Sequence, residues 1–138
     1  MKISATIANA RGEHTVAMRT EGSEKSLTIP PKVDGLGSSV NGGELLFLAM
    51  ATCYCNNIYR EGRKRGMEIE RVQVEVTGEF GVEGEGARNI AYHASVDAKA
   101  PEQEVLELMR YTDTVAEIQN TLRRGSDVVL ARVEAREI

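Results

Sequence analysis

The 138-residue chain contains little of what marks a disulfide-stabilised protein. It has two cysteines, Cys53 and Cys55, and no tryptophan. On a helix, side chains two residues apart point to nearly opposite faces, so these cysteines are a poor disulfide pair. Free thiols persist in reducing compartments, and we therefore expect a cytoplasmic protein.

Long hydrophobic runs and an excess of basic residues are also lacking. The longest apolar run covers residues 45–51, far short of the roughly 20 residues that span a bilayer. Residues 1–10 have no long apolar core of the kind found in cleavable signals. The formal net charge of -4 is the wrong sign for phosphate binding. We expect no membrane segment and no nucleic-acid partner.

The sequence offers no pattern for a metal centre. Its two histidines, His14 and His93, are far apart, and neither has a Cys, His or carboxylate partner at helical ligand spacing. We expect no metal and no cofactor. The glycine-rich segment before residue 41 could bind an anion on the N–H groups of Gly42 and Gly43, but a flexible connector is the favoured interpretation.

What the chain does have is an ordinary globular composition, 41% hydrophobic and 28% charged, at a length suited to one domain over residues 1–138. Period-two alternation predicts strands at residues 3–7, 15–19, 24–29, 68–79, 89–98 and 128–133. In the first hairpin the alternating residues are Ile3, Ala5 and Ile7, then Thr15, Ala17 and Arg19. Helices are predicted at residues 41–65 and 101–125. Hairpins join most strands, so the fold class is α+β with largely antiparallel sheets.

The predicted helix over residues 41–65 is the central element. Asn41 and Glu44 have the spacing of a capping box at its start, and Gly66 is a typical stop. Residues 45–51 are apolar on every side of the helix, which requires burial on all sides. One thin sheet cannot cover such a segment, so the sequence favours association into a homodimer.

Cys53 is the best candidate for a chemical site. It shares a helical stripe with Leu46 and Met50 on one side and Asn57 on the other, so it lies where the apolar half of the helix turns polar. That border suits a pocket lined by Leu46, Met50 and Asn57. The competing interpretation is an inert buried cysteine that acts as a small hydrophobe, and Cys55, on a different face, fits it better.

The stretch NGGELLFLAMATC, residues 41–53, resembles the motif Asn-Pro-Glu-Glu/Gln-Leu-Leu-x-x-A-x-x-x-Cys, which opens the central helix in the OsmC/Ohr family of thiol-dependent hydroperoxide reductases. The predicted element order agrees over nearly the whole chain. Residues 120–125 are also similar to the family's ending after its second cysteine. The resemblance implies an OsmC-like fold and an intertwined homodimer with sites at the subunit interface.

The resemblance also assigns roles to individual residues. Cys53 matches the peroxidatic cysteine, and Arg11, in the first hairpin, matches the arginine that holds its thiolate. Gly43 stands where the family has a glutamate at the helix start. Glu44 occupies the adjacent position and is assigned at most a minor role, as is Cys55.

The family's second, resolving cysteine has no counterpart here. Counting back from residues 120–122 places it near Ala116, followed by Glu117 where a proline is usual. Regeneration must then use an outside thiol, the other subunit or Cys55. Cys53 also lies more than two turns inside the helix, so only a cation within about 4–6 Å could offset its burial and make it a thiolate. Arg11 is the first candidate for that cation, and Arg60, one helical stripe away, is its substitute.

The leading hypothesis is therefore reduction of organic hydroperoxides, in which Cys53 attacks the O–O bond and a small thiol or dithiol regenerates it. The rival is a small-ligand-binding member of the same fold that has lost the redox cycle. The missing second cysteine and Gly43 favour the rival, whereas the retained Cys53 favours the peroxidase.

Overall fold

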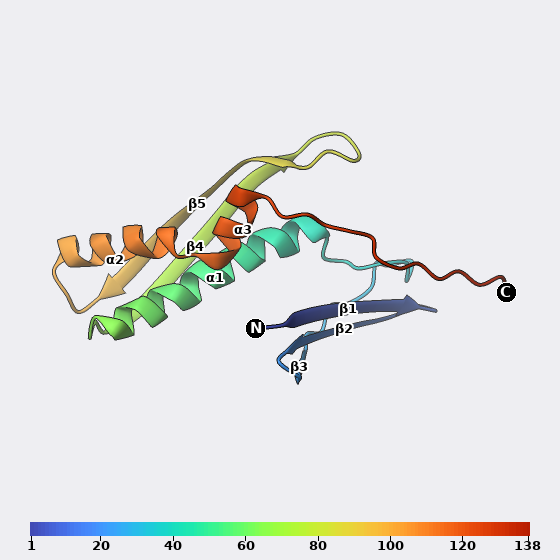
Figure 1. Ribbon diagram of the computed structural model, residues 1–138, viewed down its shortest axis with the longest axis horizontal. Helices are drawn as coiled ribbons and strands as arrows, with labels where there is room; N and C mark the ends of the chain where they lie inside the picture. The colour runs from blue at the N-terminus through green and yellow to red at the C-terminus, as the bar shows by residue number, and fades with distance from the viewer. The chain divides into compact units, whose positions relative to one another are not determined.

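Two short turns shape the N-terminal sheet in the computed structural model, which describes all 138 residues (Figure 1). Strands β1 (Ile3–Ala10), β2 (Glu13–Thr20) and β3 (Ser23–Ser26) form an antiparallel sheet in the order β1-β2-β3. The connecting turns, Arg11-Gly12 and Glu21-Gly22, have positive φ at all four residues. Two-residue turns of this kind match the right-handed twist of paired strands, so they set the register.

The register corrects the predicted face of β2. Ile7 pairs with Val16, and Ala5 pairs with Met18. The residues that share the face of Ile3, Ala5 and Ile7 are thus Val16 and Met18, not Thr15, Ala17 and Arg19. A one-residue difference in register moves every side chain to the other face, and the two-residue turn decides it. Strand β3 also ends at Ser26, earlier than the predicted residue 29.

The glycine-rich loop after β3 is tied to the β1–β2 hairpin. The Asn9 side chain donates from Nδ2 to the carbonyl of Gly35 at 3.3 Å and accepts at Oδ1 from the N–H of Gly37 at 3.1 Å. Gly35 has a φ of 78°, and a Cβ there would lie 2.9 Å from the Cα of Gly12. Only glycine fits this contact, so the loop is anchored to the hairpin rather than being a free connector.

Helix α1 (Gly42–Lys64) begins and ends within a residue of its predicted bounds. Asn41 and Glu44 form the predicted capping box: the N–H of Asn41 donates to Glu44 Oε1 at 3.0 Å, and the N–H of Glu44 donates to Asn41 Oδ1 at 2.8 Å. The chain divides inside this helix into two units, residues 1–46 and 47–138. The expected single domain over residues 1–138 stays a prediction.

The apolar segment of α1 is incompletely covered within one chain. Met50 is buried, but Leu48 is 57% exposed. The burial on all sides that its composition requires is therefore unmet by this chain alone, and cover from a second chain stays a prediction. None of the helices combines the length and hydrophobicity needed to cross a bilayer.

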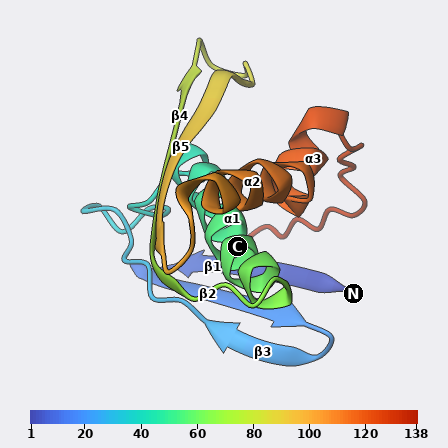
Figure 2. The same cartoon turned by 90° about the vertical axis from the view of Figure 1, so that its left-hand side faces the viewer.

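Residues 47–138 are built on a long hairpin. Strands β4 (Ile69–Phe80) and β5 (Ala87–Ala98) pair antiparallel, and α1, α2 (Glu102–Thr114) and α3 (Glu117–Arg124) lie along one side of them (Figure 2). The core of this unit is a cluster of Tyr54, Ile58 and Leu108. Inward-facing side chains of the hairpin pack against it, including Val72, Val74, Tyr92, Ala94 and Val96.

The single helix predicted over residues 101–125 is wrong, because the chain breaks between α2 and α3. Val115 has φ -112° and ψ 12°, and Ala116 is extended. The hydroxyls of Thr112 and Thr114 donate to the carbonyls of Leu108 and Tyr111. Such local bonds and the β-branched side chains of Thr112, Thr114 and Val115 weaken a helix, so it ends here.

The strand predicted over residues 128–133 is also absent. These residues form no strand, and Val128 and Leu130 are 96% and 83% exposed. Their alternation is real, but a strand needs a neighbouring backbone to bond, and no strand of this chain supplies one.

A glycine in β4 makes the packing of α1 testable. A Cβ on Gly78 would lie 2.5 Å from Cζ of Phe47, whose ring stacks on Phe80 with centroids 6.0 Å apart. Gly78→Ala should displace this ring and lower the free energy of unfolding by about 1–3 kcal/mol in urea titration. Gly86→Ala is the matched control, because a Cβ there meets nothing within 4 Å. Equal stability of the two variants would contradict this packing.

Candidate functional site

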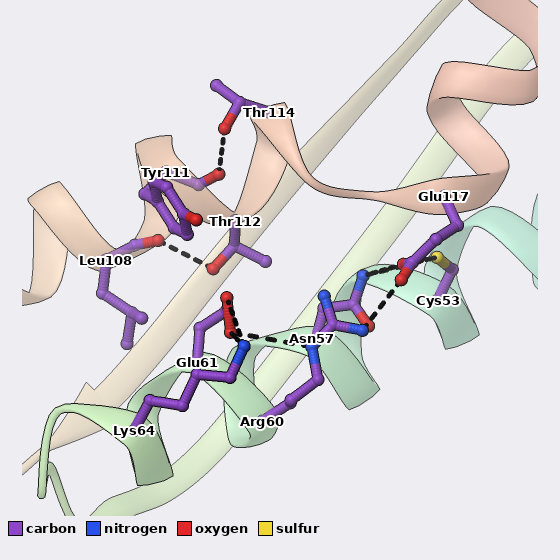
Figure 3. A network of polar contacts seen from close by, with 10 residues as sticks. All are labelled: Cys53, Asn57, Arg60, Glu61, Lys64, Leu108, Tyr111, Thr112, Thr114 and Glu117. Atoms are coloured by element: carbon purple, nitrogen blue, oxygen red, sulfur yellow. Dashed lines mark hydrogen bonds and ion pairs between the residues drawn. The ribbon is translucent and has the colours of Figure 1, made fainter.

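Cys53 is half-buried on α1 and touches polar side chains from both α1 and α3 (Figure 3). Its thiol donates to Oε1 of Glu117, with Sγ 3.7 Å from that oxygen. Asn57, one turn further along α1 and 5% exposed, donates from Nδ2 to the sulfur at 3.6 Å. The sulfur therefore has one hydrogen-bond acceptor and one donor beside it, on a residue that is only half-buried.

Glu117 reaches the sulfur because of the break between α2 and α3. The extended conformation of Ala116 starts a new helix, of which Glu117 is the first residue. Ala116 is fully buried, so this turn of the chain is anchored in the core. A carboxylate at a helix start also interacts favourably with the helix dipole.

A second contact holds α3 on α1. Gln119 is 2% exposed, and its Nε2 donates to the backbone carbonyl of Met50 at 3.1 Å. At the far end of α3, Arg123 donates to Oδ1 of Asp113 at 2.6 Å, and the hydroxyl of Tyr92 donates to the same oxygen. Burial raises the pKa of Asp113, but the hydrogen bonds from Tyr92 and Arg123 outweigh it and lower the pKa overall.

Glu117 is fully ionised at neutral pH. Desolvation raises its pKa, but hydrogen bonds outweigh that effect and hold the pKa at about 2, below the ordinary value of 4.5. The main donors are Nη1 of Arg60, 2.8 Å from Oε2, and Nδ2 of Asn57, 2.7 Å from Oε1. The group that accepts the hydrogen bond from the Cys53 thiol is thus an anion that receives hydrogen bonds from two other side chains.

Arg60 is shared between two carboxylates. Besides Glu117, its Nε lies 3.6 Å from Oε2 of Glu61, which in turn lies 3.0 Å from Nζ of Lys64. The hydrogen bond from Lys64 lowers the pKa of Glu61, burial opposes it, and the charge of Arg60 lowers it further. Arg60, the expected substitute cation for the thiol, is therefore joined to Cys53 only through Glu117.

The structure describes the surroundings of the other predicted site residues. Arg11 is the first residue of the β1–β2 turn, in residues 1–46, and its pairing with Cys53 stays a prediction. Glu44 caps α1, which accounts for its carboxylate without a chemical role. Cys55 is half-buried and unpaired.

The three predicted pocket residues have different surroundings in the structure. Met50 lines a cavity of about 210 Å³ with Ile90, Tyr92, Gln119, Leu122 and Arg123. Asn57 contacts the sulfur of Cys53 instead, and Leu46 is half-buried in the N-terminal unit. Their joint role in binding stays a prediction. No group of three or more His, Cys, Asp or Glu side chains is arranged to hold a metal ion.

Comparison with known proteins gives a family match over most of the chain. Residues 35–131 match the family described as OsmC-like protein. The chain belongs to this OsmC-like family. A search of curated protein sequences gave no significant match.

Solved structures agree on the OsmC-like fold. An OsmC-like protein from Mycoplasma pneumoniae has a TM-score of 0.65 at 19% identity, with 89% of this chain and 88% of that chain covered. An organic hydroperoxide resistance protein from Elizabethkingia anophelis has a TM-score of 0.58 at 18% identity, with 89% of each chain covered. The organic hydroperoxide resistance protein OhrB of Bacillus subtilis has a TM-score of 0.54 at 14% identity, with 89% and 91% covered.

The contact between Glu117 and Cys53 in this OsmC-like chain was missed from the sequence. The sequence pattern places Glu117 after Ala116, inside one continuous helix over residues 101–125. The signal that could have revealed it is the run Thr112-Asp113-Thr114-Val115, whose members have low helix propensity. A break there makes Glu117 the first residue of a new helix, a position at which acidic residues are common.

The ion pair between Glu117 and Arg60 predicts a specific loss of stability in acid. A lowered folded-state pKa means that the stabilisation is complete above the ordinary value of 4.5 and fades as the pH falls toward about 2. The difference in unfolding free energy between wild type and Glu117→Gln, measured in urea, should therefore be largest above pH 5 and shrink toward pH 2. The exposed Glu83, which makes no ion pair, supplies the control variant Glu83→Gln. If the difference in unfolding free energy between wild type and Glu117→Gln does not change with pH, the ion pair is contradicted.

Proposed function

We propose that this OsmC-like protein reduces organic hydroperoxides with Cys53 as the reacting thiol and an external thiol as the reductant. The family supports the reaction class, since two of the structurally similar proteins are named for organic hydroperoxide resistance. Cys53 is proposed as the reacting residue because of its position in the structure. It is a free, half-buried cysteine on the central helix with the amide of Asn57 donating to its sulfur.

The amide of Asn57 helps the sulfur carry negative charge. A hydrogen bond donated to the charged form of a group favours that form, and Nδ2 of Asn57 is 3.6 Å from Sγ. Asn57 is itself buried, so its donor is held in place. Arg11 remains the proposed cation that completes activation, because the macrodipole has little effect this far inside α1.

The reaction is a two-electron transfer. The thiolate of Cys53 forms a bond to the terminal peroxide oxygen, the O–O bond breaks, and the leaving alkoxide takes up a proton and departs as an alcohol. Cys53 is then a sulfenic acid. An external thiol attacks that sulfur, forms a mixed disulfide and releases water, and a second thiol frees Cys53 as it forms an external disulfide.

An external thiol is needed because no cysteine is present at or near Ala116, where the family's resolving cysteine is expected. Ala116 is fully buried there and has no sulfur, and its neighbour Glu117 is the residue that touches Cys53. Cys55 is two residues away on the same helix, where its side chain points to a different face. A small thiol or dithiol that reaches the open side of Cys53 is therefore the proposed reductant.

Turnover kinetics test this function. With tert-butyl hydroperoxide alone, we expect one burst of peroxide consumption per Cys53, and with added dithiothreitol we expect sustained turnover. Cys53→Ser should lose both, because the only reacting sulfur is gone, while Cys55→Ser is the matched control and should keep both. Absence of a burst in wild type, or an equal burst in Cys53→Ser, would rule out the peroxidase.

A non-catalytic binding protein is the second candidate, and one observation favours it. The carboxylate of Glu117 beside Cys53 opposes negative charge on the sulfur, and a cavity of about 210 Å³ lies at Met50, one helical turn away. The same peroxide assay separates the candidates, since a protein that only binds shows no burst.

A homodimer is part of the proposal. Apolar residues in three regions are exposed in the single chain: Ile3 and Ile7 in β1, Leu48 in α1, and Val128, Val129, Leu130 and Val133 near the C-terminus. The C-terminal stretch also has no strand to pair with in its own chain. A second copy would cover these apolar groups and supply backbone partners.

Light scattering at micromolar concentration should therefore give twice the mass of the 15.1 kDa chain. Phe47→Asp should produce insoluble or unfolded protein instead of a clean monomer, because it also removes the packing of Phe47 on Phe80 within the chain, so the mass of the wild type is the test of the dimer. Leu36→Asp is the control, since Leu36 is 68% exposed in a loop. A monomeric wild type would refute the dimer.

A further inference from the structure

The cluster around Cys53 contains a carboxylate that the proposed chemistry has not used. Glu117 is the first residue of α3, and Asn57 and Arg60 each donate a hydrogen bond to one of its two oxygens (Figure 3). A resolving cysteine is expected at the adjacent residue, Ala116. Without a resolving cysteine, the sulfenic acid of Cys53 persists until an outside thiol reduces it, and during that time it can be oxidised further.

We propose that Glu117 is a catalytic residue that controls the charge on the Cys53 sulfur, slowing its first oxidation and protecting the resulting sulfenic acid from a second. This inference rests on the proposed peroxide chemistry of Cys53. It adds a group that touches the reacting atom and a reason why the site can work without a resolving cysteine.

The first effect follows from like charges. Only the thiolate attacks a peroxide or an alkylating reagent. A carboxylate whose oxygen lies 3.7 Å from the sulfur disfavours that thiolate and accepts a hydrogen bond from the neutral thiol. Arg60 compensates part of this charge, because its guanidinium binds the other oxygen of Glu117 at 2.8 Å. The thiol is thus restrained without being blocked.

The second effect acts after the S–O bond has formed. Further oxidation requires the sulfenic acid to lose its proton, after which its sulfur attacks a second hydroperoxide, breaks that O–O bond and releases a second alcohol to leave sulfinic acid. A sulfenic O–H beside Glu117 donates to the carboxylate, and an O–H···O⁻ bond is among the stronger hydrogen bonds in proteins. The carboxylate therefore keeps the proton on oxygen, while the sulfur stays neutral and open to an external thiol.

The variant Glu117→Gln tests the effect of the negative charge of Glu117 apart from the effect of its size. The variant keeps the size of the side chain and an oxygen acceptor but removes the negative charge, and it leaves Arg60 free of that partner. All variants carry Cys55→Ser so that Cys53 is the only thiol. At pH 7, alkylation of Cys53 by iodoacetamide should become about 3- to 10-fold faster, as expected when a neighbouring like charge is removed.

The oxidation arm uses mass spectrometry. After a fixed exposure to excess tert-butyl hydroperoxide without thiol, the fraction of sulfinic acid relative to sulfenic acid should be higher in Glu117→Gln than in the parent. Glu83→Gln, at an exposed carboxylate that makes no ion pair, should change neither readout. If either the alkylation rate or the sulfinic fraction of Glu117→Gln equals that of the parent, the proposal is overturned.

Arg60→Gln gives the opposite sign and guards against a folding artefact. Without the guanidinium the charge of Glu117 is uncompensated, so alkylation of Cys53 should become slower than in the parent. Faster alkylation in both variants would indicate simple loosening of the structure and would overturn the proposal. A protein that fails to turn over peroxide disproves the proposed function. Alkylation needs no peroxide, so the alkylation rate still tests the effect of Glu117 on the Cys53 thiol in that case.

Discussion

The packing of one stripe of α1 against the hairpin and α2 positions everything else at the site. Tyr54 and Ile58, one turn apart, form the core with Leu108. The ring of Tyr54 meets that of Tyr92 edge-on at 5.1 Å, and its hydroxyl donates to the carbonyl of Met109 at 2.9 Å. Desolvation, helped by the charge of Asp113, raises the pKa of Tyr54 to about 12, so this hydroxyl keeps its proton. These contacts of Tyr54 fix the orientation of α1 about its own axis.

That orientation determines where the chemical groups of α1 point. Cys53 and Asn57 each precede a core residue by one position, so they lie together on the flank of the buried stripe. On that flank α3 is held by the bond from Gln119 to the backbone of Met50. The thiol and the amide of α1 meet the carboxylate of α3 there because the two helices are packed together.

The charged side chains near Cys53 form a connected set of ion pairs. Arg60 lies between Glu117 and Glu61, and each carboxylate is stabilised by that cation. Such compensation keeps Glu117 ionised next to a sulfur whose proposed chemistry needs negative charge.

The sequence by itself determined the elements whose signals are local. The capping box of Asn41 and Glu44 and the stop at Gly66 placed α1, period-two alternation placed β4 and β5, and the residues before Cys53 identified the family. Only the tertiary structure decided the partners of Cys53, because Glu117 is 64 residues away and reaches it through a break in a helix. The strand predicted over residues 128–133 is missing for a related reason: its alternation is local, whereas a strand also needs a paired backbone, and none pairs with it here.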